Sequence, residues 1–157
     1  MRVGIGYDVH RIVPNRVLVL GGVRFESDWG LDGHSDADVA LHALCDALLG
    51  AAALGDIGKH FPPSDEKWRG ADSLDLLRQV SELIASRGFS CGNADITIVA
   101  ERPKIGPRVE EMRARIAGAL NVEADTISVK ATTNEQIGFI GRGEGIAAIA
   151  VATILPR

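Results

Sequence analysis

The sequence predicts an α/β (α+β) fold in which one mixed β-sheet carries helices packed on one of its faces. Three observations lead to this prediction. Residues alternate with a period of two at the N-terminus, several later segments have apolar residues at helical spacing, and the last long segment is apolar without alternation. Strands and helices do not alternate strictly, which excludes a simple doubly wound fold. We expect one domain that spans residues 1–157.

The composition is that of a folded globular protein without a nucleic-acid surface. Of the 157 residues, 46% are hydrophobic and 24% are charged, and the net charge is −4. No Lys/Arg-rich run occurs, whereas a nucleic-acid-binding face needs clustered cations to neutralise phosphates. Any phosphorylated ligand therefore has to be held by local groups, such as a metal ion, backbone amides or single cations.

The cysteines and the apolar segments indicate a cytoplasmic protein. Cys45 and Cys91 are far apart in the sequence and form no C-x-x-C pair, which is typical of reduced thiols. The N-terminus starts with strand-like residues and has no basic-then-apolar leader. The longest apolar stretch, near Ile146–Leu155, has about half the length of a membrane-spanning helix. We therefore expect no membrane contact.

The first elements are predicted to be strands. Over Arg2–His10, apolar residues at odd positions alternate with Gly, Gly, Asp and His at even positions, so one face is apolar and the other is not. Arg16–Phe25 contains two short apolar runs around Gly21 and Gly22, which predicts two short strands joined by a bend. Glu26–Ser35 is predicted to be a loop.

A helix is predicted next, over Ala37–Leu54, because its apolar residues recur at helical spacing. Ser35 or Asp36 is expected to cap its N-terminus. The following segment, Gly55–Asp72, contains Gly and Pro and has no period, so it is predicted to be a long loop. A loop of this length inside a compact domain usually has a function.

Periodicity and Gly or Pro boundaries predict the remaining elements. They are a helix over Ser73–Arg87, a strand over Asn93–Ala100, a helix over Pro107–Leu120, a strand over Thr126–Thr132, a Gly-rich segment over Gly138–Gly145 and a strand over Ile146–Leu155. The last strand is apolar on both faces and has to be covered on both. Helices can cover one face, and we infer that another subunit covers the other, which predicts a homo-oligomer.

Asp8, His10 and His42 form the first candidate site. Residues i and i+2 of a strand point to the same face, and His42 lies on a polar stripe of the predicted helix. Two histidines and one carboxylate suit Zn²⁺, and three protein ligands leave a fourth position open for substrate or water. The alternative is that all three are surface or capping residues. Asp38 and Asp46 share the stripe, and one of them could orient His42; both could equally be solvated.

Three later segments are candidates for phosphate binding or tight packing. Thr132–Glu135 ends a strand, where hydroxyls and N–H groups can hold phosphate and a carboxylate can hold Mg²⁺. Ala100–Gly106 can line a base pocket with its amides, and Lys104 can reach phosphate. Taken alone, both are equally typical of ordinary turns or solvated loops. Gly138–Gly145 precedes a strand and lacks G-x-G-x-x-G spacing, so it is interpreted as tight backbone packing.

Five stretches together resemble one family, that of 2-C-methyl-D-erythritol 2,4-cyclodiphosphate synthase. The longest is SDADVALHALCDALLG over Ser35–Gly50. The others are GIGYDVH from Gly4, GDIGKHFP from Gly55, KATTNE from Lys130 and GFIGRGEGIA from Gly138. The resemblance covers essentially the whole chain in the family's order and spacing, so it is far more specific than any single motif.

The resemblance implies a metal-dependent phosphorus–oxygen lyase of the non-mevalonate route to isoprenoids (terpenoids). Members convert 4-diphosphocytidyl-2-C-methyl-D-erythritol 2-phosphate into the 2,4-cyclodiphosphate and CMP. The 2-phosphate of the substrate attacks the β-phosphorus, so no protein nucleophile is needed. The sequence agrees, because it has no G-x-S-x-G, Walker A or H-E-x-x-H motif.

The resemblance also implies roles for individual residues. It implies one Zn²⁺ per subunit on Asp8, His10 and His42, a second divalent cation (Mg²⁺ or Mn²⁺) near Glu135, and transition-state stabilisation by His34 and Thr133. The methylerythritol-phosphate side is implied to contact Ser35, Asp56, Ile57, Gly58, Phe61 and Asp65. The cytidine diphosphate side is implied to contact Ala100, Lys104, Ile105, Gly106 and Thr132.

The family forms homotrimers whose sheets face the three-fold axis, with active sites between neighbouring subunits and a central apolar cavity. Phe139 and Arg142 fall where some members bind an isoprenoid diphosphate. Three residues depart from the family pattern. Pro63 replaces a common aspartate, Asn134 replaces a usual threonine, and Tyr7 replaces a frequent phenylalanine near the cavity, where its hydroxyl needs a partner.

Two other functions are compatible with the same residues. An open zinc site could activate water in a metal-dependent phosphohydrolase, which would release inorganic phosphate without a cyclic product. A non-catalytic module could instead sense isoprenoid diphosphates through the central cavity. The whole-chain resemblance favours the synthase over both.

Overall fold

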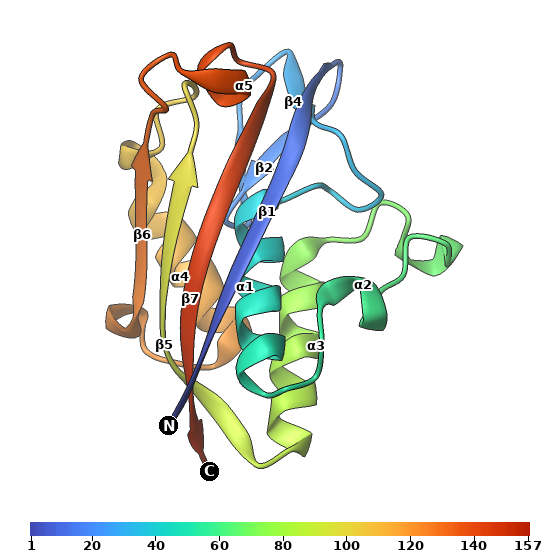
Figure 1. Ribbon diagram of the computed structural model, residues 1–157, viewed down its shortest axis with the longest axis vertical. Coiled ribbons are helices and arrows are strands. Elements are labelled where there is room, and N and C mark those ends of the chain that lie inside the picture. The colour runs from blue at the N-terminus through green and yellow to red at the C-terminus, as the bar shows by residue number, and fades with distance from the viewer.

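A five-stranded sheet runs the length of the molecule (Figure 1). The computed structural model describes residues 1–157. The strands lie in the order β4-β1-β7-β5-β6, with β1 at Arg2–Pro14, β4 at Trp29–Leu31, β5 at Phe89–Val99, β6 at Ile127–Thr132 and β7 at Gly145–Pro156. β5 and β6 are parallel, whereas the other neighbours are antiparallel, so the predicted mixed sheet is confirmed.

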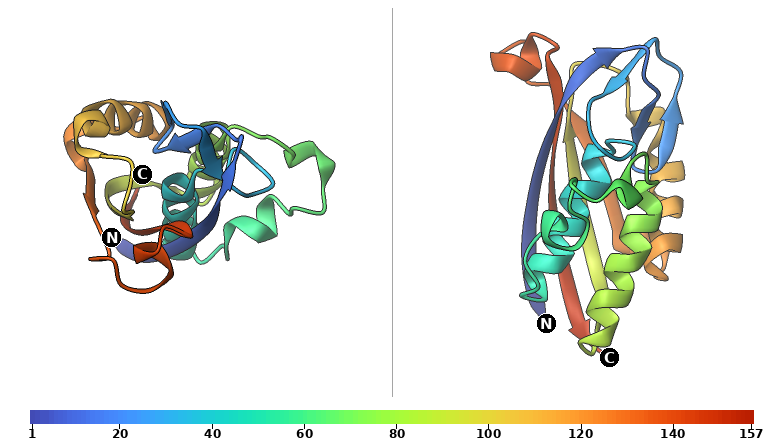
Figure 2. Two further views of the ribbon diagram at one scale, coloured as in Figure 1. Left: turned by 90° about the horizontal axis from the view of Figure 1, so that it is seen from above. Right: turned by 90° about the vertical axis from the view of Figure 1, so that its right-hand side faces the viewer.

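The long helices all cover the same face of this sheet (Figure 2). They are α1 at Val39–Ala51, α3 at Ser73–Ser86 and α4 at Val109–Leu120. Shorter turns are α2 at Ile57–His60, α5 at Gly138–Gly141, η1 at Glu66–Trp68, η2 at Gly106–Arg108 and η3 at Ala124–Thr126. The predicted pair of short strands forms a separate ribbon, β2 at Leu18–Leu20 and β3 at Val23–Phe25. Helices on one face of the sheet were predicted, and this arrangement is confirmed.

Glycine residues let β1 lie directly on α1. The inner face of β1 carries Gly4 and Gly6. A Cβ atom added to Gly4 would lie 2.0 Å from the Ala47 carbonyl oxygen, and one added to Gly6 would lie 1.9 Å from the Ala43 carbonyl oxygen. No side chain fits at these distances, so only glycine allows the two backbones to approach this closely. The contact fixes the position of α1 relative to the next inner-facing residues of β1.

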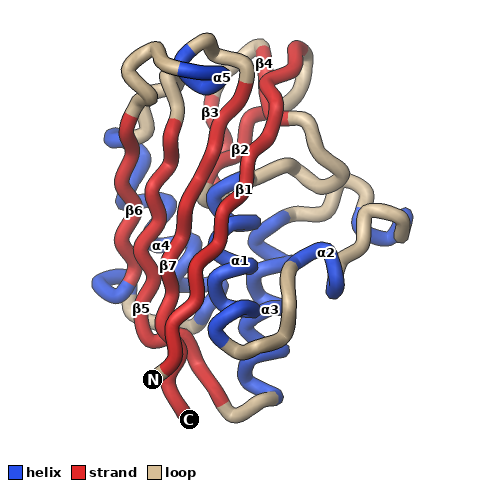
Figure 3. The backbone as a smooth tube through the Cα atoms, viewed as in Figure 1, coloured by secondary structure: helices blue, strands red, loops and turns tan.

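The outer face of β1 is apolar and open to solvent in the single chain. Ile5 is 70% exposed and Tyr7 is 55% exposed. Their register partners on the neighbouring strand are Val151 and Ile149, which are also exposed. Figure 3 shows β1 and β7 side by side over most of their length. The inner face of β7 is covered within the chain, as predicted, whereas the single chain leaves its outer face open.

Two loop predictions are wrong in part. The predicted loop Glu26–Ser35 contains β4, which pairs with the end of β1. This edge strand is only three residues long, too short to give a periodic signal. The predicted loop Gly55–Asp72 contains α2 and η1, whose N-termini are capped by the carboxylates of Asp56 and Asp65.

The start of α1 also differs from the prediction. Neither Ser35 nor Asp36 caps the helix; the N-cap is Asp38, which is fully buried. Its carboxylate accepts hydrogen bonds from the N–H groups of Ala40 and Leu41. It also accepts hydrogen bonds from the backbone N–H groups of the Gly21-Gly22 bend, at 2.9 and 2.6 Å. Asp38 therefore joins the β2–β3 ribbon to the helix, a role that only the tertiary structure reveals.

The remaining predictions on the cysteines and apolar segments have simple outcomes. Cys45 and Cys91 are buried free thiols, as expected. The core consists largely of Ala, Val, Ile and Leu side chains between the sheet and the helices. None of the helices has the length and hydropathy needed to cross a bilayer.

Replacing Gly6 by alanine tests the glycine contact. The new Cβ would meet the Ala43 carbonyl oxygen at 1.9 Å, so we expect Gly6→Ala to lower the free energy of unfolding by about 2–4 kcal/mol. Gly50→Ala is the matched control, because that α1 position has no atom within 4 Å of an added Cβ. The control should be neutral or slightly stabilising. Equal urea denaturation midpoints for both variants would contradict the role of the contact.

Candidate active site

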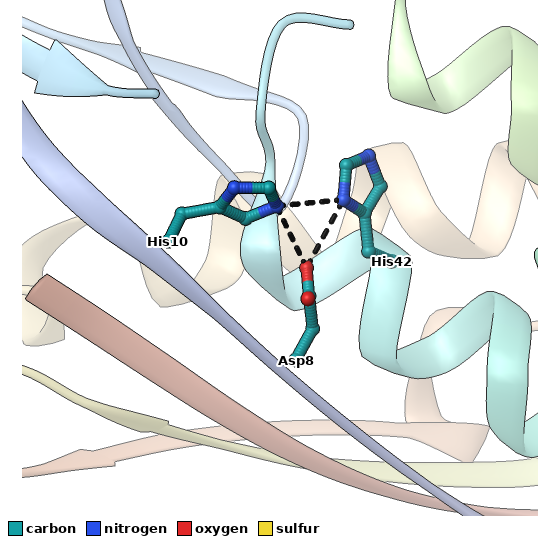
Figure 4. A group of neighbouring side chains, drawn as sticks. All are labelled: Asp8, His10 and His42. Atoms are coloured by element: carbon teal, nitrogen blue, oxygen red, sulfur yellow. Dashed lines mark hydrogen bonds and ion pairs between the residues drawn. The ribbon is translucent and has the colours of Figure 1, made fainter. Parts of the chain in front are cut away.

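Three potential metal ligands converge where β1 meets α1 (Figure 4). The Nε2 atom of His10 lies 2.9 Å from Oδ2 of Asp8 and 3.1 Å from Nδ1 of His42. The Nδ1 atom of His42 lies 3.1 Å from the same carboxylate oxygen. Asp8 and His10 extend the inner face of β1 beyond the glycines, and His42 projects from α1. The prediction that these side chains lie together is confirmed.

The remaining ring nitrogens have partners that leave the converging nitrogens free to bind a cation. Nδ1 of His10 contacts the Asp32 carbonyl oxygen, which can only accept, so this nitrogen carries the proton. Nε2 of His42 lies 3.0 Å from the hydroxyl oxygens of Ser35 and Ser73. Hydrogen bonds at the outer nitrogens orient metal-binding imidazoles in this way.

The donor set fits zinc. Bonds of about 2.0–2.1 Å in tetrahedral geometry separate ligand atoms by about 3.3 Å. The observed separations of 2.9, 3.1 and 3.1 Å are within a few tenths of this value. Three protein ligands leave one tetrahedral position for a substrate atom. The side chains are only partly buried, at 26% exposure for Asp8 and 13% for His42, so a ligand can reach them.

Electrostatic coupling within the triad shifts two protonation equilibria. Burial raises the pKa of the Asp8 carboxyl, but its contacts with His10 and His42 outweigh burial and hold that pKa well below the usual range. Burial lowers the pKa of His10, whereas Asp8 and the Asp32 carbonyl raise it, and the net shift is upward. The Asp8 carboxylate therefore stays ionised and stabilises a positive charge beside it, as a metal site requires.

A pocket of about 250 Å³ opens over the triad. Of the residues predicted for the methylerythritol side, the pocket lining includes Ser35, Ile57, Gly58 and Phe61, together with His34. Sequence reasoning missed Trp68 and Leu76 as lining residues and had Pro63 only as a departure from the family. Asp56 and Asp65 are absent from this lining, because their carboxylates cap the backbone N–H groups of Lys59 and Lys67.

A second pocket, of about 390 Å³, lies at the β5–β6 side of the sheet. Its lining contains all residues predicted for the cytidine side and Thr133, namely Ala100, Lys104, Ile105, Gly106, Thr132 and Thr133. The two pockets share no lining residue, and β7 separates β1 from β5 in the sheet. A single chain therefore keeps the two sets of predicted substrate contacts apart.

Glu135 lies on the turn that follows β6, beside the second pocket. The carboxylate of Glu101 accepts hydrogen bonds from the backbone N–H groups of Asn134 and Gln136, at 2.8 and 3.4 Å. Glu135 sits between them with a positive φ of 50°, and its N–H group donates to the Thr133 hydroxyl. Glu101 thus shapes the turn that presents Glu135, whose carboxylate is exposed.

Phe139 lies on α5, and Arg142 directly follows this helix. Figure 1 shows α5 at the upper end of the sheet, beside the start of β7. Phe139 is 42% exposed. The Arg142 guanidinium pairs with Glu144 at 2.6 Å. Both side chains are accessible to a ligand.

The residues that support His42 differ from those predicted. Asp38 caps α1 instead, and Asp46 accepts a hydrogen bond from the Ile57 N–H group at 2.7 Å, which holds the start of α2 beside the pocket. The hydroxyl of Ser73 contacts His42, and Asp36 contacts Ser73. Ser73 is 31 residues from His42 in sequence, so no spacing pattern could have revealed the contact.

Comparisons with known proteins show what the whole chain is similar to. The chain matches the YgbB family over residues 1–155. It is 67% identical over 157 residues to the 2-C-methyl-D-erythritol 2,4-cyclodiphosphate synthase of Symbiobacterium thermophilum, and the match covers 100% of both chains. It is similar to the bifunctional IspDF from Campylobacter jejuni, with a TM-score of 0.96 and 42% identity over 99% of this chain and 42% of that chain. It is also similar to IspF of Plasmodium falciparum in a CDP complex, with a TM-score of 0.87 and 34% identity over 99% and 96% of the two chains.

The affinity of the triad for Zn²⁺ should depend on pH through His10. Its pKa is raised mainly by Asp8 against the effect of burial, and below that pKa a proton competes with the metal. Apparent affinity should rise by up to about tenfold per pH unit until the pH passes this pKa, and then level off. Competition titrations with a chromophoric chelator between pH 5.5 and 8.5 measure this. His60→Ala is the control, because the His60 ring contacts the Leu54 carbonyl oxygen outside the pocket, and this variant should keep the wild-type dependence of zinc affinity on pH. A wild-type affinity that does not change with pH would contradict the assignment of His10 as a metal ligand.

Proposed function

The chain belongs to the YgbB family, and we propose that residues 1–157 act as one domain that converts 4-diphosphocytidyl-2-C-methyl-D-erythritol 2-phosphate into 2-C-methyl-D-erythritol 2,4-cyclodiphosphate and CMP. The activity is that of a 2-C-methyl-D-erythritol 2,4-cyclodiphosphate synthase of the non-mevalonate pathway, since the identity to such an enzyme is 67% over the full length. The observation that carries the proposal is the convergence of Asp8, His10 and His42 beside a pocket in a chain of this family.

The triad binds one Zn²⁺ in this proposal. Asp8 contributes the negative charge, and His10 and His42 contribute the nitrogen atoms that their outer hydrogen bonds leave free. When bound, Zn²⁺ supplies a Lewis acid and a template for phosphate oxygens. The protein's own part is to hold the three donor atoms at the observed separations and to keep the fourth side accessible from the pocket.

The pocket over the triad takes the methylerythritol phosphate part of the substrate. Its apolar wall is formed by Ile57, Phe61, Trp68 and Leu76, and such a wall suits a carbon chain with a methyl group and excludes water. Phe61 and Trp68 form an edge-on aromatic pair with centroids 4.9 Å apart, which stiffens the wall. Polar contacts come from Ser35 and Gly58 and, in our proposal, from Asp56 and Asp65, whose carboxylates cap the neighbouring turns in this structure.

The second pocket takes the cytidine diphosphate part. A related enzyme, IspF of Plasmodium falciparum, has been solved as a CDP complex, which supports a cytidine nucleotide as ligand of this chain. Lys104 and the Thr132 and Thr133 hydroxyls suit diphosphate oxygens, and backbone groups of Ala100–Gly106 suit the base. Glu135 holds a second divalent cation, Mg²⁺ or Mn²⁺, because hard cations prefer carboxylate and phosphate oxygens.

The residues act mainly by positioning. An oxygen of the substrate's 2-phosphate bonds to the β-phosphorus as the bond from that phosphorus to the CMP oxygen breaks, so CMP carries away the electron pair. The two pockets hold the ends of a flexible molecule so that attacking and leaving oxygens lie in line, which can supply several kcal/mol of the barrier. His34 and Thr133 donate hydrogen bonds to the transferring group, and Lys104 offsets charge on the departing CMP.

A homotrimer would join the two pockets. Within one chain they lie on either side of β7, so a neighbour that brings its β5–β6 side to the β1 side of this chain completes the site. The open apolar face of β1 and β7 is then covered around the three-fold axis. The cavity on this axis, with Phe139 and Arg142 near its mouth, accepts an isoprenoid diphosphate. The enzyme acts in the cytoplasm in this proposal.

Phosphorus NMR of the purified protein with the cytidine diphosphate substrate and Mg²⁺ tests the function. Cyclic diphosphate and CMP should appear, vanish on chelation and return with Zn²⁺ and Mg²⁺. His42→Ala should lose at least about 10³-fold in turnover while keeping its circular dichroism and melting profile, and His60→Ala should stay active. Inorganic phosphate without cyclic product would instead indicate a hydrolase, and tight isoprenoid diphosphate binding without turnover a sensor.

Analytical ultracentrifugation tests the assembly. The wild-type protein should sediment with three times the 16.6 kDa mass of one chain. Ile5→Asp places a charge in the middle of the open apolar face and should shift the protein to monomers with loss of cyclisation. Val17→Asp is the control, because Val17 is exposed and lies outside the five-stranded sheet. A monomeric wild type with full activity would overturn the intersubunit site.

A further inference from the structure

The outer nitrogen of His42 ends a chain of partly buried polar contacts that the proposed reaction does not use directly. We propose that Asp36 and Ser73 are positioning residues that lock the His42 ring so that its Nδ1 lone pair points at the metal. The inference rests on the proposed metal site and concerns how this chain builds it. It assigns a role to two residues that are far apart in the sequence: Asp36 precedes α1, and Ser73 begins α3.

The contacts form a continuous line from a carboxylate to the triad. Asp36 accepts hydrogen bonds from the Ser73 hydroxyl at 2.5 Å and from the Ser73 backbone N–H group at 3.0 Å. The Ser73 hydroxyl oxygen lies 3.0 Å from Nε2 of His42. Nδ1 of the same ring faces Asp8 and His10. Ser73 has no exposed surface, so water cannot replace its hydroxyl.

The direction of each hydrogen bond follows from the carboxylate. A carboxylate can only accept, so the single Ser73 hydroxyl proton points at Asp36. The hydroxyl oxygen then presents a lone pair to His42, which favours the tautomer with the imidazole proton on Nε2. Nδ1 is left unprotonated and free to bind Zn²⁺. Ser35 offers a second hydroxyl oxygen at 3.0 Å from Nε2, and this oxygen already accepts the Ala37 N–H group.

An amide at position 36 reverses this order. In Asp36→Asn the amide oxygen can keep the hydrogen bond from the Ser73 backbone N–H group, and the NH₂ group then takes the place of Oδ1. There it loses the hydrogen bond that Oδ1 accepts from the Asp38 N–H group and donates to the Ser73 oxygen, so the Ser73 proton turns towards Nε2 of His42. Such a bond favours the tautomer with the proton on Nδ1, the atom that zinc needs. Substitutions at hydrogen-bond partners of metal-binding histidines typically weaken metal binding by about 10–100-fold, and we expect a loss in this range for Asp36→Asn.

Zinc affinity of the full-length protein, measured by competition with a chelating dye, tests the inference. Asp36→Asn should bind Zn²⁺ about 10–100-fold more weakly than the wild type. Asp72→Asn is the matched control, because Asp72 caps α3 next to Ser73 through the Leu74 N–H group and its carboxylate bonds neither Ser73 nor His42. This control should keep the wild-type affinity.

A double-mutant cycle shows whether Asp36 acts through Ser73. Ser73→Ala removes the connecting hydroxyl but leaves Ser35 beside Nε2, so its own loss should be a few-fold. In the Ser73→Ala background, Asp36→Asn should cause no further loss, because the path to His42 is cut. An undiminished loss in that background would mean that Asp36 acts by another route, and the proposal would fall.

The tautomer provides a readout that a merely structural role would not move. In metal-free protein labelled with ¹⁵N-histidine at pH 8, His42 should show its proton on Nε2, and Asp36→Asn should move it to Nδ1; the signal is assigned by its loss in His42→Ala. Unchanged zinc affinity or an unchanged tautomer in Asp36→Asn would overturn this inference but not the proposed metal site. A wild type that binds no zinc at the triad would overturn the proposed metal site and, with it, the inference.

Discussion

The contact between β1 and α1 determines most of what this structure can do. Gly4 and Gly6 bring the strand backbone onto the carbonyl groups of Ala47 and Ala43, closer than any side chain would allow. Because strand residues alternate, Asp8 and the histidine two residues later share the face of these glycines. The same close packing brings His42 of α1 to them. The candidate metal site is therefore a direct continuation of a packing contact.

The structure also separates what one chain can supply from what it cannot. The triad and the pocket above it are complete within the chain, and so is the pocket beside Lys104 and Thr133. In the proposed reaction a single substrate occupies both pockets at once, and the sheet keeps them on different sides of β7. The exposed apolar face of β1 and β7 offers a physical reason for assembly. The proposed trimer would cover this face and would also bring the two pockets of neighbouring chains together.

The parts of the site that sequence could predict are those with a local pattern or a family signature. Alternation predicted that Asp8 and His10 share a face, helical spacing predicted the helix of His42, and the resemblance supplied the ligand set. Tertiary contacts had no such signal. The sequence allowed Asp38 to be either a residue that orients His42 or a solvated helix residue, yet it is buried and accepts hydrogen bonds from the N–H groups of the distant Gly21-Gly22 bend. The Asp36 and Ser73 contacts were hidden for the same reason, as was the three-residue strand β4.

The central claim is that three atoms, Oδ2 of Asp8, Nε2 of His10 and Nδ1 of His42, bind one metal ion. Anomalous diffraction at the zinc absorption edge, from crystals of protein purified without chelators, tests it most directly. The account predicts one strong peak per chain at about 2.0–2.2 Å from each of these atoms. A peak bound through Nε2 of His42, or no peak between the three side chains, would contradict the account.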